Sequence, residues 1–352
     1  MKERYYMSDL RWWVEHGDAA EALKVLPDGS VDALVTDPPA GIGFMGKEWH
    51  CSNGGRDKWI AWLAGILAEC RRAMKPGAYG WVWALPRTSH WTATACEDAS
   101  FAVRDVLVHV FGTGFPKSRS LLKPAAEHWI LIKAPGELRE LRIEENRIGT
   151  TKQVPGSLSV KNQGVEGGWG LGKKKPTDSG QDVNTGRWPA NFALSHSDDC
   201  ADTCADDCAV RMLDEQSGDC PSGGGNKNVR NRDQRNAFGK GLGKGNGWGI
   251  GGDSGGASRF FYQAKPSTKE RSQGLADGAR NTHTTVTSIS LMRHLVSLIA
   301  APGTTILDPF TGSGSTGIAA LAEGCRFVGV EREAEYVEIA RQRIAAEAAK
   351  AR

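Results

Sequence analysis

The sequence lacks three features that would each have narrowed its class at once. None of its apolar runs approaches the roughly 20 residues of a membrane span. Its first residues, Met-Lys-Glu-Arg-Tyr-Tyr, lack the apolar stretch of a secretion signal. Its net charge is only +3, from 44 Lys and Arg against 41 Asp and Glu, so any basic surface must be local. We therefore expect a cytoplasmic protein without membrane contact, whose eight cysteines are thiols or metal ligands.

Both ends of the chain alternate between predicted strands and helices. At 352 residues the chain is long enough for one large or two moderate domains. Apolar runs predict strands at Val31–Thr36, Ala78–Ala84, Val103–Phe111, His128–Lys133, Thr304–Leu307 and Arg326–Val330. Helical spacing and stop signals predict helices at Asp57–Met74, Ser290–Ala300, Thr316–Glu323 and Ala334–Ala349. The two ends together predict an α/β fold.

The middle of the chain, residues 136–282, has a different composition. It is rich in Gly, Lys, Asn, Ser and Asp and has few long apolar runs. Residues 221–280 hold eleven Lys and Arg against four Asp and Glu, a local net charge of +7. Such a stretch would bind phosphates without reading sequence, although each residue also fits a solvated loop. The candidates for phosphate contacts are Lys227, Arg230, Arg232, Arg235, Lys240 and Lys244.

The first informative motif is Val-Thr-Asp-Pro-Pro-Ala at residues 35–40. It ends the apolar run at 31–36 with an acid and two prolines. Proline cannot extend a sheet and restricts the residue before it to extended geometry, so the chain must leave the sheet here. Asp37 is therefore predicted at the carboxyl end of a buried strand, where open α/β sheets bind their ligands.

The second motif, Asp-Pro-Phe-Thr-Gly-Ser-Gly-Ser-Thr-Gly, occupies residues 308–317 and follows another predicted strand. Its glycines allow a tight turn and close approach of a ligand to the backbone. Glu331 ends the next strand, where an acid can accept hydrogen bonds from ribose hydroxyls. A tight turn or any nucleotide site would explain the glycines alone, but a dinucleotide fingerprint would lack the Asp-Pro-Phe.

The two motifs together resemble the Asp-Pro-Pro-Tyr and Asp-Pro-Phe-x-Gly-x-Gly-Thr motifs of DNA amino-methyltransferases. Their order along the chain is similar to the β group of that family, a circularly permuted form of one fold. The resemblance implies a Rossmann-like sheet that uses S-adenosylmethionine and acts on double-stranded DNA. It makes residues 1–135 the catalytic half, 136–282 an inserted, Gly-rich region for target recognition, and 283–352 the cofactor-binding half.

The resemblance also implies that residues from both ends of the chain bind S-adenosylmethionine. Thr285 belongs to His-Thr-Thr-Val-Thr at residues 283–287, where many relatives have His-Pro-Thr-Val-Lys-Pro. The implied cofactor-binding residues are Asp18, Thr285, Asp308, Phe310, Gly312, Gly314, Thr316 and Glu331.

The chemistry of the reaction explains why an acid precedes the prolines. The exocyclic amine of a base is a poor nucleophile because its lone pair is delocalised into the ring. Asp37 and the main-chain oxygen of Pro38 would each accept one N–H of the amine, and Pro39 would stiffen the loop that aims them. The base must also be flipped out of the duplex, because its amine is inaccessible in the stack.

Position 40 departs from the family pattern, because Ala40 stands where relatives usually carry an aromatic residue. An aromatic ring stacked on the flipped base contributes roughly 1–3 kcal/mol. Phe44 and Trp49 follow in the same loop and are candidates to supply that ring. The alternative is that both rings pack within the loop or the core.

A possible metal site lies in the middle region, where His196, Cys200, Cys204 and Cys208 recur every four residues. Three thiolates and one imidazole suit a structural zinc site, which would help a region with little core to fold. The same spacing also follows one face of a helix, and a straight helix cannot bring four ligands to one ion. A zinc site therefore requires this segment to bend, and Cys220 is an alternate ligand.

The residue at position 37 favours one target base over the other. With Asp at this position the chain resembles the adenine-N6 enzymes of the family, whereas the cytosine-N4 enzymes more often carry Ser there. We predict methylation of adenine N6, with cytosine N4 as the alternative. Two other functions stay open: methylation of RNA or protein, whose enzymes usually carry Asn before the prolines, and DNA binding by a relative inactivated through Ala40.

Overall fold

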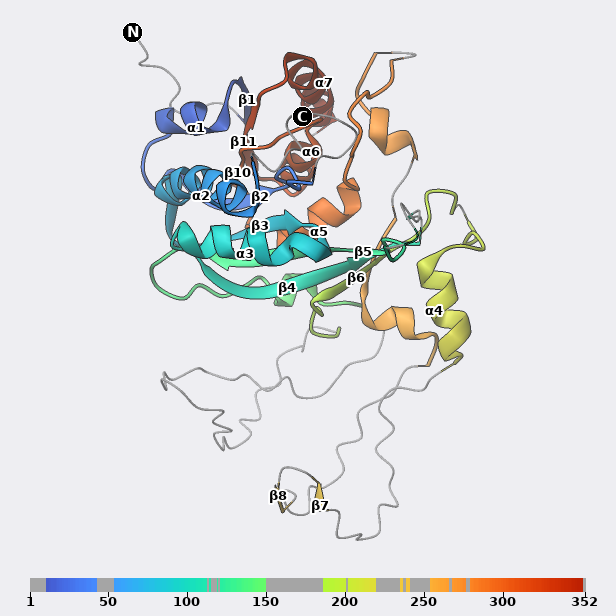
Figure 1. The fold of residues 1–352 in the computed structure, drawn as a ribbon. Helices are drawn as coiled ribbons and strands as arrows, with labels where there is room; N and C mark the ends of the chain where they lie inside the picture. The colour runs from blue at the N-terminus through green and yellow to red at the C-terminus, as the bar shows by residue number, and fades with distance from the viewer. Residues whose placement is uncertain are drawn as a thin grey trace, which may run out of the picture.

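A nine-stranded, mostly parallel sheet forms the centre of the molecule (Figure 1). The computed structural model describes residues 11–42, 54–112, 114, 119, 121–149, 186–200, 202–219, 235–236, 239–240, 254–265, 268–276 and 279–350. Within them the strand order is β1-β11-β10-β2-β3-β5-β4-β6-β9. The strands are β1 (Trp12–His16), β2 (Val31–Thr36), β3 (Met74–Ala84), β4 (Ala102–Val110), β5 (Ala126–Lys133), β6 (Phe192–Ser195), β9 (Tyr262–Ala264), β10 (Thr305–Asp308) and β11 (Arg326–Glu331). Only β5 runs antiparallel to its neighbours, so the other strands end at one edge of the sheet.

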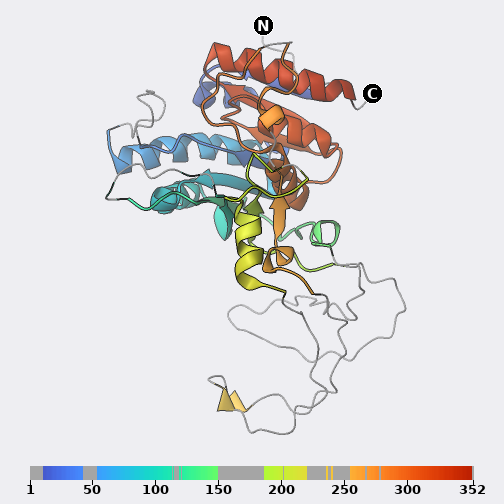
Figure 2. The same cartoon turned by 90° about the vertical axis from the view of Figure 1, so that its right-hand side faces the viewer.

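Helices cover both faces of this sheet; Figure 2 shows α2 to the left of the strands and α6 to the right. One face carries α1 (Ala19–Ala22), α2 (Arg56–Ala73) and α3 (Ser89–Asp98), and the other carries α5 (Ile289–Ile299), α6 (Ser315–Ala322) and α7 (Ala334–Lys350). Single 3-10 turns lie at Leu23–Val25, Pro86–Thr88, Glu144–Asn146, Ala257–Phe260 and Thr268–Ser272. No helix in these described ranges is long and apolar enough to cross a membrane.

The need for two helical layers follows from the strands themselves. Successive strand residues point to opposite faces, and Ala33, Leu34 and Val35 are all fully buried. Leu34 packs with α2 and α3, whereas Ala33 and Val35 pack with α5 and α6. The alternation of strands and helices predicted for both ends of the chain is therefore confirmed, with boundaries that differ by a few residues at most.

The two strands that carry the motifs lie side by side, although 272 residues separate Thr36 from Asp308. β10 pairs in parallel with β2, with Ile306 opposite Ala33. After β2 the chain passes through α2, on one face of the sheet, to β3. After β10 it passes through α6, on the other face, to β11, so the two connections lead to opposite sides of the β10–β2 pair. The boundary between β10 and β2 is thus the reversal point of the strand order, where open α/β sheets bind ligands.

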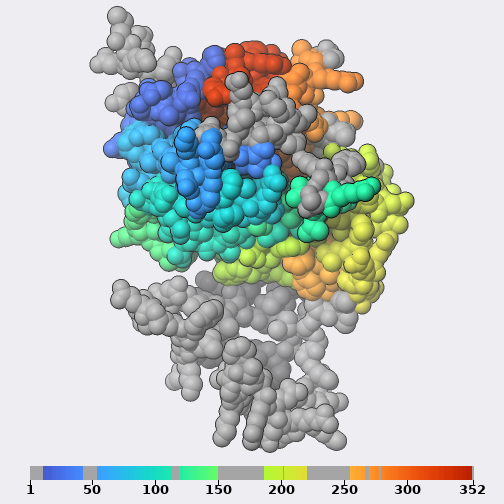
Figure 3. All heavy atoms as spheres, in the orientation of Figure 1, coloured from blue at the N-terminus to red at the C-terminus, as the bar shows by residue number. Residues whose placement is uncertain are grey.

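The middle region adds two strands to the sheet that the sequence did not reveal. β6 pairs in parallel with β4, and β9 pairs in parallel with β6. Helix α4 (Ala209–Ser217) follows β6, and Figure 3 shows the yellow-green atoms of this region forming a continuous surface with the body of the molecule. Strands of four and three residues are too short to give a period-two signal.

Most of the basic residues proposed for phosphate contacts are not among the residues that the structure describes. Lys227, Arg230, Arg232 and Lys244 lie outside the described residues. Arg235 and Lys240 belong to the two-residue strands β7 (Arg235–Asn236) and β8 (Gly239–Lys240), which pair with each other.

Candidate active site

A cavity of about 790 Å³ opens at the edge of the sheet where the parallel strands end. Three of its carboxyl groups follow or end neighbouring strands: Asp37 after β2, Asp308 in β10 and Glu331 in β11. Its volume lies within the roughly 300–1,000 Å³ of typical ligand pockets. The cavity therefore lies at the reversal point of the sheet, with the residues of both motifs in its walls.

Asp37 occupies the centre of this edge, between the β10–β11 side of the cavity and the β3–β4–β6 side. As its two prolines predict, β2 ends at the residue before it. The hydroxyl of Thr287 donates a hydrogen bond to Oδ2 of Asp37 over 3.3 Å. Burial, followed by the negative charges of Glu127 and Asp308, raises the pKa of Asp37 well above its usual value. Asp37 is therefore a stronger proton acceptor than an ordinary carboxylate.

Asp308 joins the two motifs directly. Its Oδ1 accepts hydrogen bonds from the hydroxyl of Thr36 over 2.7 Å and from the N–H of Phe310 over 3.0 Å. The side chains of Asp308 and Thr36 are fully buried. Burial raises the pKa of Asp308 to about 6, although hydrogen bonds from Thr316 and Thr36 act in the opposite direction.

This raised pKa predicts a pH-dependent gain in stability for Asp308→Asn. A carboxyl group whose pKa rises from 3.8 to about 6 on folding stabilises the fold below pH 3.8 and loses that contribution as the pH rises through 6. The asparagine keeps the acceptor oxygen but cannot ionise. We expect the variant to gain up to about 3 kcal/mol in unfolding free energy over wild type at pH 8, and only about 0.5 kcal/mol at pH 4. Denaturant unfolding at both pH values measures the difference, and an equal loss of stability at both would contradict it.

The turn between β10 and α6 has a shape that requires glycine at two positions. Gly312 and Gly314 have φ angles of +52° and +87°, and a Cβ on Gly314 would lie 3.1 Å from the Cα of Ala340. The N–H groups of Gly312 and Glu333 donate to the two carboxylate oxygens of Glu331, each over 2.8 Å. Burial raises the pKa of Glu331. The turn thus fixes the orientation of an acid that faces the cavity.

Seven of the eight cofactor-binding residues implied by the resemblance line this cavity, and Gly314 is not among its lining residues. Asp18 caps α1 by accepting the N–H of Ala20 over 2.9 Å, next to a hydrogen bond of 3.0 Å from the N–H of Gly17 to the main-chain oxygen of Glu331. Gly314 is the N-cap of α6. The remaining residues of the set line the cavity together with Asp18: Thr285, Asp308, Phe310, Gly312, Thr316 and Glu331.

The residues proposed for catalysis are placed in part. Asp37, Pro38 and Pro39 line the cavity, as does the buried Ala40. Phe44 and Trp49 lie outside the described residues, so their proposed stacking stays a prediction. Among the described residues, the Trp, Phe and Tyr rings in the cavity wall belong to Trp62, Trp83, Phe111, Phe310 and Tyr336.

Sequence reasoning missed a hydrogen-bonded chain on the β4–β6 side of the cavity. Nδ1 of His109 lies 2.7 Å from Oε1 of Glu127, and its Nε2 lies 2.7 Å from the hydroxyl of Ser195. Trp83 donates its ring N–H to Oε2 of Glu127 over 2.9 Å. Burial raises the pKa of Glu127, but the hydrogen bond and charge of His109 and the bond from Trp83 outweigh it and leave that pKa below its usual value. The sequence signal for this chain was a polar residue near one end of an apolar strand. His109 lies near the end of β4, and Glu127 lies near the start of β5.

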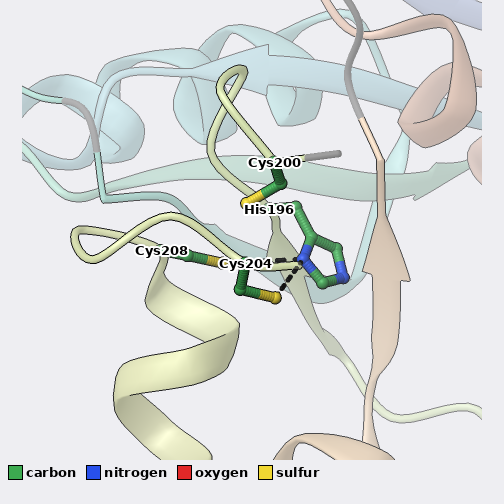
Figure 4. A group of neighbouring side chains, drawn as sticks. All are labelled: His196, Cys200, Cys204 and Cys208. Atoms are coloured by element: carbon green, nitrogen blue, oxygen red, sulfur yellow. Dashed lines mark hydrogen bonds between the residues drawn. The ribbon is translucent and has the colours of Figure 1, made fainter. Parts of the chain in front are cut away.

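The Cys₃His cluster, formed by His196, Cys200, Cys204 and Cys208, lies in the loop between β6 and α4. Figure 4 shows the four side chains pointing toward one another. Their ligand atoms all lie within 4.8 Å of one another. Nδ1 of His196 is 3.4 Å from Sγ of Cys204 and 3.5 Å from Sγ of Cys208, and Cys208 is the N-cap of α4. The segment therefore has the bend that a shared metal requires, and Cys220 lies outside the described residues.

Known proteins resemble this chain in sequence and in fold. A family model described as DNA methylase, covering N6 and N4 methyltransferases, matches residues 31–342. Type II methyltransferase M2.DpnII of Streptococcus pneumoniae is 46% identical over 57 residues, 16% of this chain and 21% of that protein. Type II methyltransferase M.HinfI of Haemophilus influenzae is 35% identical over 65 residues, 18% of each chain. The match spans about a fifth of the length of these curated relatives.

The fold is also found in solved structures. The PvuII DNA methyltransferase, described as cytosine-N4-specific, superposes with a TM-score of 0.51 at 12% identity. The similarity covers 94% of this chain and 86% of that one. The predicted Rossmann-like methyltransferase sheet is therefore confirmed.

Proposed function

Since the chain belongs to the DNA methylase family, we propose that it transfers a methyl group from S-adenosylmethionine to an exocyclic amine of a base in double-stranded DNA. The proposed target atom is adenine N6. One observation carries the proposal: Asp37, Asp308 and Glu331, from motifs at opposite ends of the chain, line a single cavity at the reversal point of the sheet.

The part of the cavity beside β10 and β11 fits the methyl donor. The carboxylate of Glu331, held by two backbone N–H groups, can accept hydrogen bonds from ribose hydroxyls. The rings of Trp62 and Phe310, with centroids 5.7 Å apart, supply an apolar wall. When bound, S-adenosylmethionine supplies a methyl group on an electron-poor sulfonium sulfur. The protein's part is to hold that methyl group facing Asp37.

The part of the cavity beyond Asp37 fits a base flipped out of the duplex. Asp37 and the main-chain oxygen of Pro38 each accept one N–H of the amine and aim the nitrogen lone pair at the methyl group. The nitrogen–carbon bond forms as the sulfur–carbon bond breaks, and the amine then loses one proton. Asp37 is the proposed acceptor of that proton, because its raised pKa brings it closer to the operating pH.

A pH profile of Glu127→Gln tests this assignment of the proton. The negative charge of Glu127 is the second cause of the raised pKa of Asp37, after burial. Removing that charge lowers the pKa of Asp37, so the acid limb of kcat/KM is expected to move to lower pH. Glu97→Gln, an exposed position on α3, is the control and should leave the limb in place. A limb that stays in place in Glu127→Gln would contradict the role of Asp37 as proton acceptor.

Adenine is the proposed base because the residue before the two prolines is an aspartate. An aspartate at this position resembles the one in the adenine-N6 enzymes. Cytosine N4 is the second candidate for the target atom. The PvuII enzyme, described as cytosine-N4-specific, has 12% identity to this chain and supports the fold only.

The proposed enzyme has three parts along the chain. Residues 1–135 and 283–352 are its catalytic and cofactor-binding halves, and 136–282 is its region for target recognition. The basic stretch within that region would contact phosphates. A structural zinc ion in the Cys₃His cluster is the second proposed bound group.

Transfer of a tritiated methyl group to unmethylated duplex DNA, RNA and protein tests the proposed substrate class. We expect incorporation into DNA alone. Incorporation into RNA or protein but not DNA would replace the proposed substrate. No incorporation, together with intact DNA binding, would favour an inactive relative of the family.

A further inference from the structure

The loop that carries the Cys₃His cluster has little apolar core to hold its shape. The fully buried apolar residues around it are Leu194, Cys208 and Val210. Five aspartates lie between its ends, of which Asp206 pairs with Arg211 of α4: Asp198, Asp199, Asp202, Asp206 and Asp207. Small irregular segments of this kind usually depend on a metal or a disulfide for stability.

Two spacings in the cluster are close to those of a tetrahedral zinc site. Zinc bonds of roughly 2.3 Å to sulfur and 2.0–2.1 Å to nitrogen place ligand atoms roughly 3.5–3.8 Å apart. The two distances from Nδ1 of His196 to cysteine sulfurs, 3.4 and 3.5 Å, are close to this spacing. The N–H of Ala205 donates to Sγ of Cys200 over 3.3 Å, as backbone groups around metal-bound sulfurs do. Three sulfurs and one imidazole favour zinc over cations that prefer oxygen.

The same loop forms part of the cavity wall. His196 and Ser195 both line the cavity. The N–H of His196 donates to the main-chain oxygen of Ala264 in β9 over 2.9 Å. Ser195 contacts His109, which contacts Glu127. A ligand of the cluster is thus one residue away from the hydrogen-bonded chain that faces Asp37.

We infer that one Zn²⁺ ion, bound by the Cys₃His cluster, fixes the end of β6 and thereby holds Ser195 and His109 in place in the base-binding wall. The metal acts through these positioning residues and contacts neither the base nor the methyl donor. The cofactor side of the cavity is built on β1, β10 and β11, so loss of the metal leaves it intact. The metal site stands independently, whereas its effect on base binding rests on the proposed methyl transfer.

Metal analysis of the purified full-length protein tests the site itself. We expect about one zinc per chain in wild type, and none in Cys204→Ser or Cys208→Ser. Cys96→Ala, a buried thiol of α3 outside the cluster, is the matched control and should retain the zinc. Less than about half an equivalent in wild type, iron in place of zinc, or a disulfide within the cluster detected by mass would each overturn the inference.

Hydrogen exchange and binding measurements test the effect on the wall. After zinc is removed with a chelator, we expect faster amide exchange in peptides covering 192–217 and the end of β4, with no change in β10 and β11. S-adenosylmethionine should bind with unchanged affinity, while kcat/KM on DNA falls roughly 10–100-fold and recovers when zinc is restored. Ser195→Ala should retain the zinc and reproduce part of that fall.

These readouts separate the two proposals. Metal content, exchange and cofactor affinity can be measured even if the wild type methylates nothing, in which case only the proposed function fails. Exchange that changes equally in β10 and β11, or activity that is unchanged without zinc, would overturn the inferred role of the metal.

Discussion

Replacing Asp37 by alanine is expected to lower kcat for methyl transfer by roughly 10²–10⁴-fold. The variant loses both the acceptor that orients the amine and the proposed acceptor of its proton. The substitution leaves the proposed cofactor-binding residues on the β10–β11 side in place. Asp37 forms a hydrogen bond with Thr287 and, among the residues that the structure describes, with none of those around Glu331. Rapid-quench assays with saturating S-adenosylmethionine and DNA measure the loss, and calorimetry measures the affinity for S-adenosylmethionine.

The matched control for this variant is Asp28→Ala, an exposed acid nine positions earlier in the chain whose side chain pairs with Arg72. It should leave kcat unchanged. A decrease in kcat of less than about tenfold in Asp37→Ala would remove Asp37 from the reaction. An equal loss of cofactor affinity and kcat would indicate that the substitution has disturbed the fold of the site.

The affinity for S-adenosylmethionine is expected to fall roughly 10–100-fold in Glu331→Ala. Hydrogen bonds to a charged group contribute about 1.5–3 kcal/mol each, and the carboxylate is proposed to accept them from the ribose. Its removal also leaves the N–H groups of Gly312 and Glu333 without the bonds that fix the turn. Equilibrium binding of the methyl donor to the full-length protein measures the effect.

Glu338→Ala provides the comparison, because it removes an exposed acid on α7 that accepts a hydrogen bond from Gln342 of the same helix. Its affinity for the methyl donor should equal that of wild type. If Glu331→Ala also bound with wild-type affinity, the acid at the end of β11 would have no role in holding the ribose.

Sequence reasoning found the parts of the site that depend on short, local chemistry. Two prolines after Asp37 end a strand, and the glycines after Asp308 allow a tight turn, so each motif predicted its own place at a strand end. The order of the motifs implied a circularly permuted form of one fold, but no pairing of particular strands. The structure adds the parallel pairing of β10 with β2.

The remainder of the site depends on tertiary contacts that leave no local signal. His109, Glu127 and Ser195 come from three separate strands and meet only because β4 lies between β5 and β6. Strands β6 and β9 are too short to be recognised by periodicity and are stabilised by pairing, β6 with β4 and β9 with β6. The burial that raises the pKa of Asp37 is likewise a property of the assembled cavity.

Digestion of the methylated DNA to nucleosides and identification of the modified base by mass spectrometry test the central claim most directly. Duplex DNA treated with the wild-type protein and S-adenosylmethionine is predicted to yield N6-methyladenosine as its deoxynucleoside, and DNA treated with Asp37→Ala is predicted to yield none. Detection of N4-methylcytosine instead would identify cytosine as the target base. DNA that contains no methylated amine after treatment with wild type would contradict the account.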